Sequence, residues 1–199
     1  MITKDGDHEV IPDARNLPSP GTCRRHLYVL GSSTAEVVGR VGGWIFDRAM
    51  AGWDVTVCIP GLHDVRPLRI LGARADDDGP VVASLDNWAG QLDLAVAVEV
   101  YDGDASVRRL VCRMLDEGSC ELTIWGDLRP ADVDARLLRS AHRLSAAAAA
   151  FKKHALAAAV VPAATTAGSE VFYSTAAHPS RCGTGYAARH SPRNFVEEG

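Results

Sequence analysis

The segment from His26 to Ile59 constrains the fold more than any other part of the chain. An apolar run at residues 27–30 stops at the turn that begins with Gly31, a helical pattern follows, and a β-branched run at residues 55–59 closes the segment. This succession of strand, helix and strand predicts a βαβ unit, in which two parallel strands share one sheet and the helix packs across it. We therefore expect an α/β protein that is organised around this unit.

The helix expected inside this unit has an apolar stripe and several glycines. Its large apolar residues recur at three- and four-residue spacing, which indicates one face packed on the sheet. Gly39, Gly42 and Gly43 are poor helix residues, since each costs on the order of 1 kcal/mol relative to alanine. Their presence predicts that another part of the chain approaches the helix closely.

Four more segments carry a regular pattern after this unit. Residues 68–71 and 120–125 predict strands, and residues 105–117 predict an amphipathic helix. Residues 94–101 are ambiguous, because their β-branched alternation suits a strand while their alanines permit a helix; the turn residues that follow favour the strand. The Arg74 to Pro80 stretch is predicted to be a loop. About five mainly parallel strands are therefore expected, in an order that the sequence does not specify.

The longest periodic run lies at residues 130–161 and predicts one long C-terminal helix. Proline is favourable at the start of a helix, and Pro162 would stop it. Apolar residues recur at three- and four-residue spacing along one side. The opposite side is predicted to be a basic outer face, formed by Arg136, Arg139, Arg143, Lys152 and Lys153. Because such a helix is longer than the strands, its apolar side is predicted to pair with a second copy of the chain in a homo-oligomer such as a homodimer.

The predicted fold is a three-layer α/β domain with a mainly parallel sheet of about five strands, of the Rossmann-like or flavodoxin-like type. This domain would span residues 26–162 and include the long helix. Residues 1–25, with several prolines among polar residues, predict a flexible arm. Residues 163–199 contain few large apolar side chains and predict a poorly ordered or surface-wrapping tail with irregular structure, anchored at most by aromatic residues such as Phe172.

Composition narrows the functional classes. A net charge of −4 and an isoelectric point near 5.9 give no bulk attraction to phosphate backbones, so nucleic-acid binding is not expected. The five cysteines form no CxxC pair, which favours reduced thiols in the cytoplasm. No window resembles a membrane span, and the first residues lack the apolar stretch of a secretory signal.

The best ligand-site candidate is the turn formed by Gly31, Ser32, Ser33 and Thr34. In parallel α/β sheets, ligands bind beyond the carboxyl ends of the strands, where helix N-termini present unpaired N–H groups. This turn is therefore predicted to bind a small anionic ligand. It lacks the glycine spacing of a dinucleotide fold and the ending of a P-loop. An alternative is that Ser33 or Thr34 only caps the helix, with Glu36 adding favourable charge at the same end.

Two residues at strand ends are weak catalytic candidates, His63 and Asp127. His63 follows the second strand next to Asp64, where an acid or base would face a bound ligand. No nucleophile elbow is present, and the histidines are scattered through the chain. No cluster of ligands predicts a metal, and no cofactor is specified.

These patterns support two functional hypotheses. The first is a non-catalytic, regulatory α/β domain that binds a ligand at the turn or a protein partner through residues 130–161. It follows from the lack of a convergent set of catalytic residues. The alternative is an enzyme that acts on a nucleotide or a phosphate-containing small molecule, with His63 or Asp127 as acid or base. The biological role and the identity of the ligand are not encoded in a recognisable motif.

Overall fold

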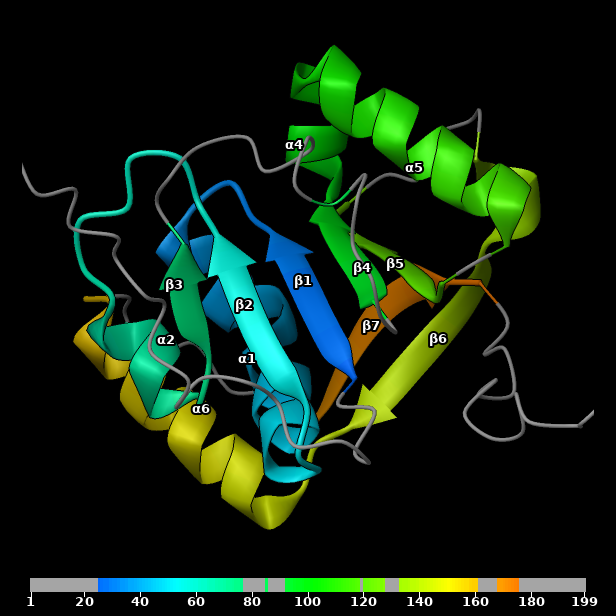
Figure 1. Cartoon of the computed structure of the whole chain (residues 1–199). Helices are drawn as coiled ribbons and strands as arrows, with labels where there is room; N and C mark the ends of the chain where they lie inside the picture. The colour runs from blue at the N-terminus through cyan, green and yellow to red at the C-terminus, as the bar shows by residue number, and fades with distance from the viewer. Residues whose placement is uncertain are drawn as a thin grey trace, which may run out of the picture.

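The described residues form a seven-stranded mixed sheet with helices on both faces (Figure 1). The computed structural model describes residues 25–76, 85, 92–118, 120–127, 133–160 and 168–175. The strands are β1 (His26–Leu30), β2 (Asp54–Cys58), β3 (Arg74–Asp76), β4 (Leu92–Ala97), β5 (Leu122–Trp125), β6 (Leu138–Arg143) and β7 (Ser169–Ser174). The helices are α1 (Thr34–Met50), α2 (Arg66–Ile70), α4 (Val98–Gly103), α5 (Ala105–Glu117) and α6 (Ala146–Ala158), with a 3-10 turn at Asp134–Arg136.

The strand order is β3-β2-β1-β4-β5-β7-β6. Strands β3, β2, β1, β4 and β5 run parallel to one another, whereas β7 runs antiparallel to both β5 and β6. The chain leaves β1 toward β3 and then returns to β4 on the other side, which makes the β1/β4 pair the topological switch point. The first five strands follow the Rossmann-type order. The expected three-layer, mainly parallel α/β fold is confirmed, with two more strands than predicted.

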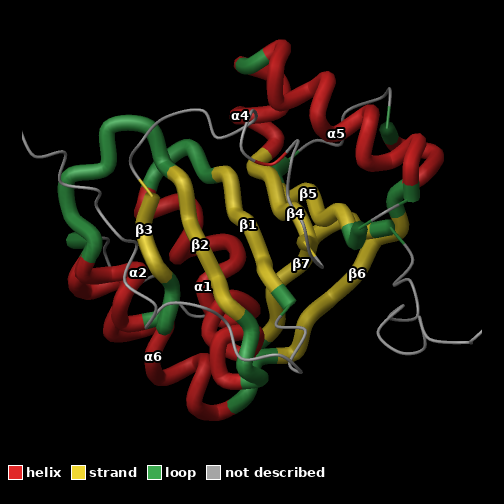
Figure 2. Tube along the Cα trace, viewed as in Figure 1, coloured by secondary structure: helices red, strands yellow, loops and turns green. Residues whose placement is uncertain are grey.

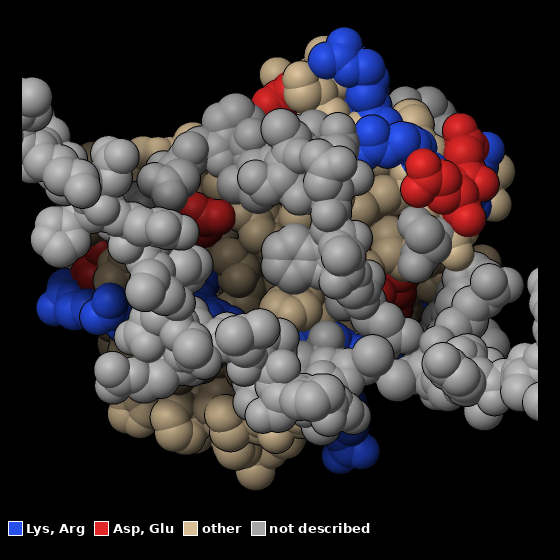
Figure 3. Space-filling model, viewed as in Figure 1, with Lys and Arg blue, Asp and Glu red and all other residues tan. Residues whose placement is uncertain are grey.

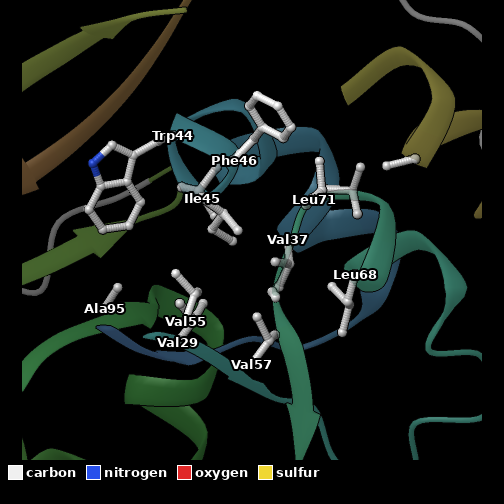
Figure 4. Close-up of a cluster of buried hydrophobic side chains, with 14 of the residues drawn as sticks. Val29, Val37, Trp44, Ile45, Phe46, Val55, Val57, Leu68, Leu71 and Ala95 are labelled. Carbon is white, nitrogen blue, oxygen red and sulfur yellow. The ribbon is translucent and has the colours of Figure 1, made fainter. Parts of the chain in front are cut away.

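Two hydrophobic clusters, one on each face of the sheet, hold the layers together (Figure 2). Helices α1, α2 and α6 cover one face, while α4 and α5 cover β4 and β5 on the other. Neighbouring residues of β1 point to opposite faces, so Val29 joins the first cluster and Tyr28 the second. In Figure 4, Val29 and Val57 of the strands face Val37 of α1 across that first cluster. No helix among the described residues is both long enough and apolar enough to cross a bilayer.

Helix α1 matches the sequence pattern closely. Its predicted apolar stripe is buried, and Ser33 is the N-cap residue. A Cβ atom added at Gly43 would lie 2.5 Å from Leu144, and one at Gly42 would lie 3.2 Å from Leu71. The predicted close approach is therefore confirmed at these two glycines. At Gly39 a Cβ atom would meet no atom of the described residues within 4 Å, so close packing among them does not explain that glycine.

The predicted long helix at residues 130–161 is wrong. Residues 138–143 form β6, and only Ala146–Ala158 is helical. The reason is tertiary, because β6 pairs along its whole length with β7, which lies more than twenty residues further along the chain. Leu138, the first residue of β6, is 64% exposed on this edge strand. The predicted interface between two copies depended on one continuous helix, and residues 138–145 do not form part of one.

The predicted basic outer face of one helix is wrong as well. Arg136 lies in the 3-10 turn, and Arg139 and Arg143 lie on β6. Lys152 is 4% exposed and packs inside the protein, where its ammonium group meets the carboxylate of Glu170 on β7. Lys153, its neighbour in α6, is exposed as expected. A lysine that is buried in this way needs a counter-charge, and that counter-charge comes from a segment that the sequence pattern assigns to a tail.

Part of the predicted C-terminal tail is an ordered strand. Residues 169–174 form β7, which lies between β5 and β6 in the sheet. The inward side chains Glu170 and Phe172 alternate with exposed ones, and the Phe172 ring lies 5.1 Å from that of Trp44. Residues 163–167 and 176–199, like the N-terminal arm at residues 1–24, lie outside the described residues.

Two shorter assignments also differ from the sequence pattern. The predicted strand at residues 68–71 belongs mostly to helix α2, because Leu68 and Leu71, three residues apart, are both buried against the α1 layer. Strand β3 instead occupies Arg74–Asp76, inside the predicted loop. The ambiguous residues 94–101 are divided, with β4 ending at Ala97 and α4 following at once.

Charged side chains over α5 are mixed in sign. In the space-filling view of Figure 3, basic and acidic groups lie beside one another on that part of the surface. Arg113 lies 3.9 Å from Glu117 within the helix, and Arg136 lies 2.6 Å from Asp116. In each of these two pairs a basic side chain is matched by an acidic one, so their charges cancel.

Candidate functional site

A cavity of about 360 Å³ opens beyond the carboxyl ends of β1 and β2. It is lined by the turn between β1 and α1, at Ser32, Ser33 and Thr34, and by the loop at residues 59–64 after β2. Pro67 and residues 158–160, at the C-terminal end of α6, also line it. The structure thus brings the predicted ligand-binding turn together with His63, as expected for two loops on the same edge of a parallel sheet.

The four residues of the predicted turn have different roles. Gly31 is buried and hydrogen-bonds to β2, its N–H lying 3.0 Å from the Cys58 carbonyl oxygen; a Cβ atom there would lie 2.1 Å from Val37. Ser33 Oγ accepts the N–H of Glu36 at 3.2 Å, which is an N-cap bond. Ser32 and Thr34 line the cavity without being the N-cap residue. Ser32 is therefore the exposed hydroxyl of the turn that is best placed to meet a ligand.

The loop after β2 presents one imidazole and one carboxylate to the cavity. His63 is exposed on the cavity wall. Asp64 accepts hydrogen bonds from the Arg66 backbone N–H at 2.9 Å and from the Arg66 guanidinium at 2.7 Å. These bonds from Arg66 lower the pKa of the Asp64 carboxyl to about 2, so it is ionised near neutral pH. Asp64 is thus held by Arg66, and His63 is the residue suited to exchange a proton.

Asp127, the other weak catalytic candidate, does not line this cavity. Its carboxylate is 78% exposed and lies 2.6 Å from the guanidinium of Arg40 on α1. A surface ion pair of this kind contributes little to stability and leaves the carboxylate solvated.

Glu36 is a titratable group that the sequence pattern identifies only as a favourable charge at the helix start. The indole N–H of Trp125, at the end of β5, donates to Glu36 Oε1, and Oε2 is buried with no hydrogen-bond partner among the described residues. Burial, with a further contribution from the nearby carboxylate of Glu99, raises the pKa of Glu36. The S-x-x-E spacing from Ser33 to Glu36 is the only local signal for this residue. Glu36 therefore lies in the first turn of α1, next to the turn that lines the cavity.

A serine, an aspartate and a histidine also meet at the opposite end of α1, but their order does not suit catalysis. Asp47 is the central group, since its carboxylate accepts from Ser145 Oγ at 2.6 Å and lies 2.8 Å from His142 Nε2. Nucleophilic catalysis needs the histidine next to the hydroxyl. Ser145 is in addition the N-cap of α6, accepting the N–H of Ala148 at 3.0 Å. This cluster joins α1 to α6.

No three histidine, cysteine, aspartate or glutamate side chains within the described residues lie close enough together to hold a metal ion. The turn offers hydroxyl groups, and its neighbours His63 and Asp64 come from a single loop. Zinc sites in proteins are built from cysteine, histidine and carboxylate ligands. The side chains at this edge of the sheet therefore do not fit a zinc site.

The fold is similar to that of several solved enzymes. A teicoplanin deacetylase in its zinc-inhibited form matches with 11% identity and a TM-score of 0.53, over 76% of this chain and 98% of its own. The 4-carboxy-2-hydroxymuconate hydratase of Pseudomonas putida matches with 12% identity and a TM-score of 0.51, over 78% of this chain and 98% of its own. No protein-family model and no curated protein matches the sequence.

These similarities correct the first functional hypothesis. The solved structures that share the fold are enzymes, a deacetylase and a hydratase, so the expectation of a non-catalytic regulatory domain is wrong. At 11% and 12% identity the similarity concerns the fold, and no residue role is transferred from either enzyme. The zinc named for the deacetylase has no matching ligand set among the described residues of this chain.

Proposed function

We propose that this chain is an enzyme that uses water to cleave, or adds water to, a small polar molecule bound in the cavity beside Ser32 and His63. The observation that carries the proposal is the meeting of the Ser32 to Thr34 hydroxyls with the His63 imidazole at the carboxyl edge of parallel strands. Ligands of open α/β sheets bind at this edge. A concave site with a few convergent polar groups is the usual form of a small-molecule site.

The charges around the cavity favour a neutral substrate over the anionic ligand predicted from the sequence. The guanidinium of Arg66 is held by Asp64, and that of Arg40 is held by Asp127. The carboxyl of Glu36 already lies near the positive end of α1. The groups left for a ligand are hydroxyls and an imidazole, which hydrogen-bond well to hydroxyl and amide groups. A hydroxylated or amide-bearing substrate therefore fits better than a phosphate ester.

Two side chains have complementary roles in the proposed reaction. The His63 imidazole takes a proton from the attacking water. It then gives this proton to the leaving group in a hydrolysis, or to the other carbon of the double bond in a hydration, because histidine exchanges protons readily near neutral pH. The Ser32 hydroxyl donates to the substrate oxygen on which negative charge develops. Deacetylation and hydration, the reactions named for the structural neighbours, both consume water, which supports this class of reaction.

A turnover screen with matched variants tests the proposal. The panel contains N-acetylated amino sugars, O-acetylated sugars and unsaturated hydroxy amides, with acetate release and loss of ultraviolet absorbance as readouts. His63→Ala is expected to lower kcat/KM by about 10²–10⁴-fold and Ser32→Ala by roughly tenfold. His154→Ala, which alters an exposed histidine on the helix that borders the cavity, is the control and should leave kcat/KM within about twofold.

Two outcomes contradict the proposal. One is that no member of the panel is turned over. The other is turnover that His63→Ala and His154→Ala change by the same factor, because a catalytic imidazole and a solvated one would then be indistinguishable. Circular dichroism of each variant checks that the fold is intact.

A further inference from the structure

The residues that line the cavity differ in chemistry. The turn after β1 contributes hydroxyls and the loop after β2 adds His63 and Asp64, whereas other lining residues present apolar groups. These aliphatic residues are Ile59, Leu62, Pro67, Ala158, Ala159 and Val160. A neutral polar molecule alone would leave this apolar surface uncovered. The cavity therefore has both polar and apolar lining residues, and those at the C-terminal end of α6 are apolar.

Val160 is an unusual residue at the apolar rim. It follows Ala159, the C-cap residue of α6, and has a φ angle of 55°, in the left-handed region. A β-branched residue is disfavoured there, and glycine or asparagine is the usual choice where a helix ends in this way. Val160 is also 88% exposed, so its isopropyl group is in water. Neither the backbone conformation nor the burial of the side chain explains a valine at this position.

Backbone strain that is retained next to a binding cavity is characteristic of functional positions. The N–H of Val160 donates to the Ala157 carbonyl oxygen at 3.2 Å, which closes the helix end. Val160 lines the cavity together with Ala158 and Ala159. An aliphatic group of a ligand that lay along these three residues would cover the exposed surface of Val160.

We propose that Val160 contacts the substrate and that the substrate is amphipathic, with a hydroxylated or amide-bearing head beside Ser32 and His63 and an aliphatic chain against Val160. The assignment of the head group rests on the proposed function. The assignment of the chain rests on the apolar lining residues and on the conformation of Val160. Removal of the aliphatic part of such a ligand weakens binding, because the apolar surface then stays in water.

Binding of two soluble probes tests this inference. Octyl β-D-glucoside, kept below its micelle concentration, carries both parts, and methyl β-D-glucoside carries only the head. Each is titrated into the full chain while the backbone amide signals of residues 32–34 and 157–160 are followed by NMR. The wild type is expected to bind the octyl probe about tenfold or more tightly than the methyl probe.

Two substitutions remove the valine without disturbing the helix end. Val160→Gly and Val160→Asn both suit the left-handed conformation, so each should raise Tm by roughly 2–4 °C. Each is expected to weaken binding of the octyl probe about threefold to tenfold and to leave binding of the methyl probe unchanged. Val171→Ala is the control, since Val171 is an exposed valine on β7 that does not line the cavity.

The results separate this inference from the proposed function. Equal behaviour of the two probes, including undetectable binding of both, overturns the inference, as does octyl binding that both Val160 variants leave unchanged. A preference for the octyl probe that depends on Val160 supports it even if turnover proves insensitive to His63→Ala. In the reverse case, loss of turnover in His63→Ala without any effect of Val160 leaves the proposed function standing alone.

Discussion

The ammonium group of Lys152 lies 2.5 Å from the carboxylate of Glu170, and together these side chains bond to the backbone inside helix α1. The Glu170 carboxylate accepts the N–H groups of Gly43 at 2.8 Å and Trp44 at 2.7 Å, while Lys152 Nζ donates to the Gly39 carbonyl oxygen at 2.7 Å. Gly39 and Gly43 are four residues apart, the spacing of one helical hydrogen bond. The ion pair thus bonds to the Gly39 carbonyl oxygen and to the Gly43 N–H, the two groups that such a helical bond would join. It thereby links α6 and β7 to α1.

Loss of the lysine is expected to be severe, because it leaves a buried carboxylate without its counter-charge. Lys152→Met should lower the free energy of unfolding by about 3–5 kcal/mol. Urea unfolding followed by circular dichroism gives the value. The control Lys153→Met changes the exposed neighbour and should cost less than about 0.5 kcal/mol. Similar losses in the two variants would show that the ion pair is not a major contributor.

Two glycines of α1 are expected to respond in opposite directions to the same substitution. Gly43→Ala places a methyl group 2.5 Å from Leu144 and 3.2 Å from Glu170, and should cost about 1–3 kcal/mol. Gly39→Ala meets no atom of the described residues within 4 Å and should stabilise the protein by up to about 1 kcal/mol through helix propensity. Thermal and urea unfolding of both variants measure the difference. A destabilised Gly39→Ala variant would contradict the expectation.

The buried carboxyl of Glu36 is expected to make stability fall with rising pH. Because burial raises the pKa of Glu36, the fold favours the protonated acid. This contribution is complete below the unfolded-state pKa and is lost as pH rises through the folded-state pKa. Glu36→Gln cannot ionise and keeps an acceptor for the Trp125 indole. The Tm of this variant minus that of the wild type should therefore increase between about pH 4 and about pH 8, and a difference that is constant with pH contradicts the prediction.

Asp47 should show the opposite dependence. Partial burial acts to raise its pKa, but hydrogen bonds from Ser145 and His142 outweigh burial and lower the pKa of Asp47. Its contribution is present above the unfolded-state pKa and is lost as pH falls through the folded-state pKa. The stability advantage of the wild type over Asp47→Asn should thus be present near neutral pH and shrink below about pH 4. Urea titrations at several pH values measure it, with Asp116→Asn as an exposed control.

The local part of the fold can be predicted from the sequence because it depends on short-range patterns. The β1, α1 and β2 unit and helix α5 each show their own periodicity and end at their own turn residues. The pairing of β6 with β7 cannot be seen in this way, since neither strand is buried on both faces and each depends on a partner far along the chain. A continuous helical periodicity across residues 130–161 therefore indicated the wrong element.

The residues of the candidate site also differ in whether a local sequence pattern predicts them. The turn at residues 31–34 and His63 follow directly from strand ends, because parallel strands bring their carboxyl ends to one edge. Val160 lines the cavity because α6 is a separate helix that packs on α1. The continuous periodicity of residues 130–161 gives no sign that α6 starts as a separate helix. The contact of Glu36 with Trp125 joins residues 89 positions apart and has no local counterpart in the sequence.

The position of β7 between β5 and β6 also sets an order for biosynthesis. A nascent chain emerges from the ribosome N-terminus first, so β6 is exposed before the strand that fills the gap beside it has been translated. Until residue 170 emerges, Lys152 has no counter-charge and α1 lacks the carboxylate on which Gly43 and Trp44 depend. Completion of the sheet must therefore wait for the last described strand, and a chain that stops before Ser169 would be left with an unpaired edge at β5, the kind of surface on which newly made proteins aggregate.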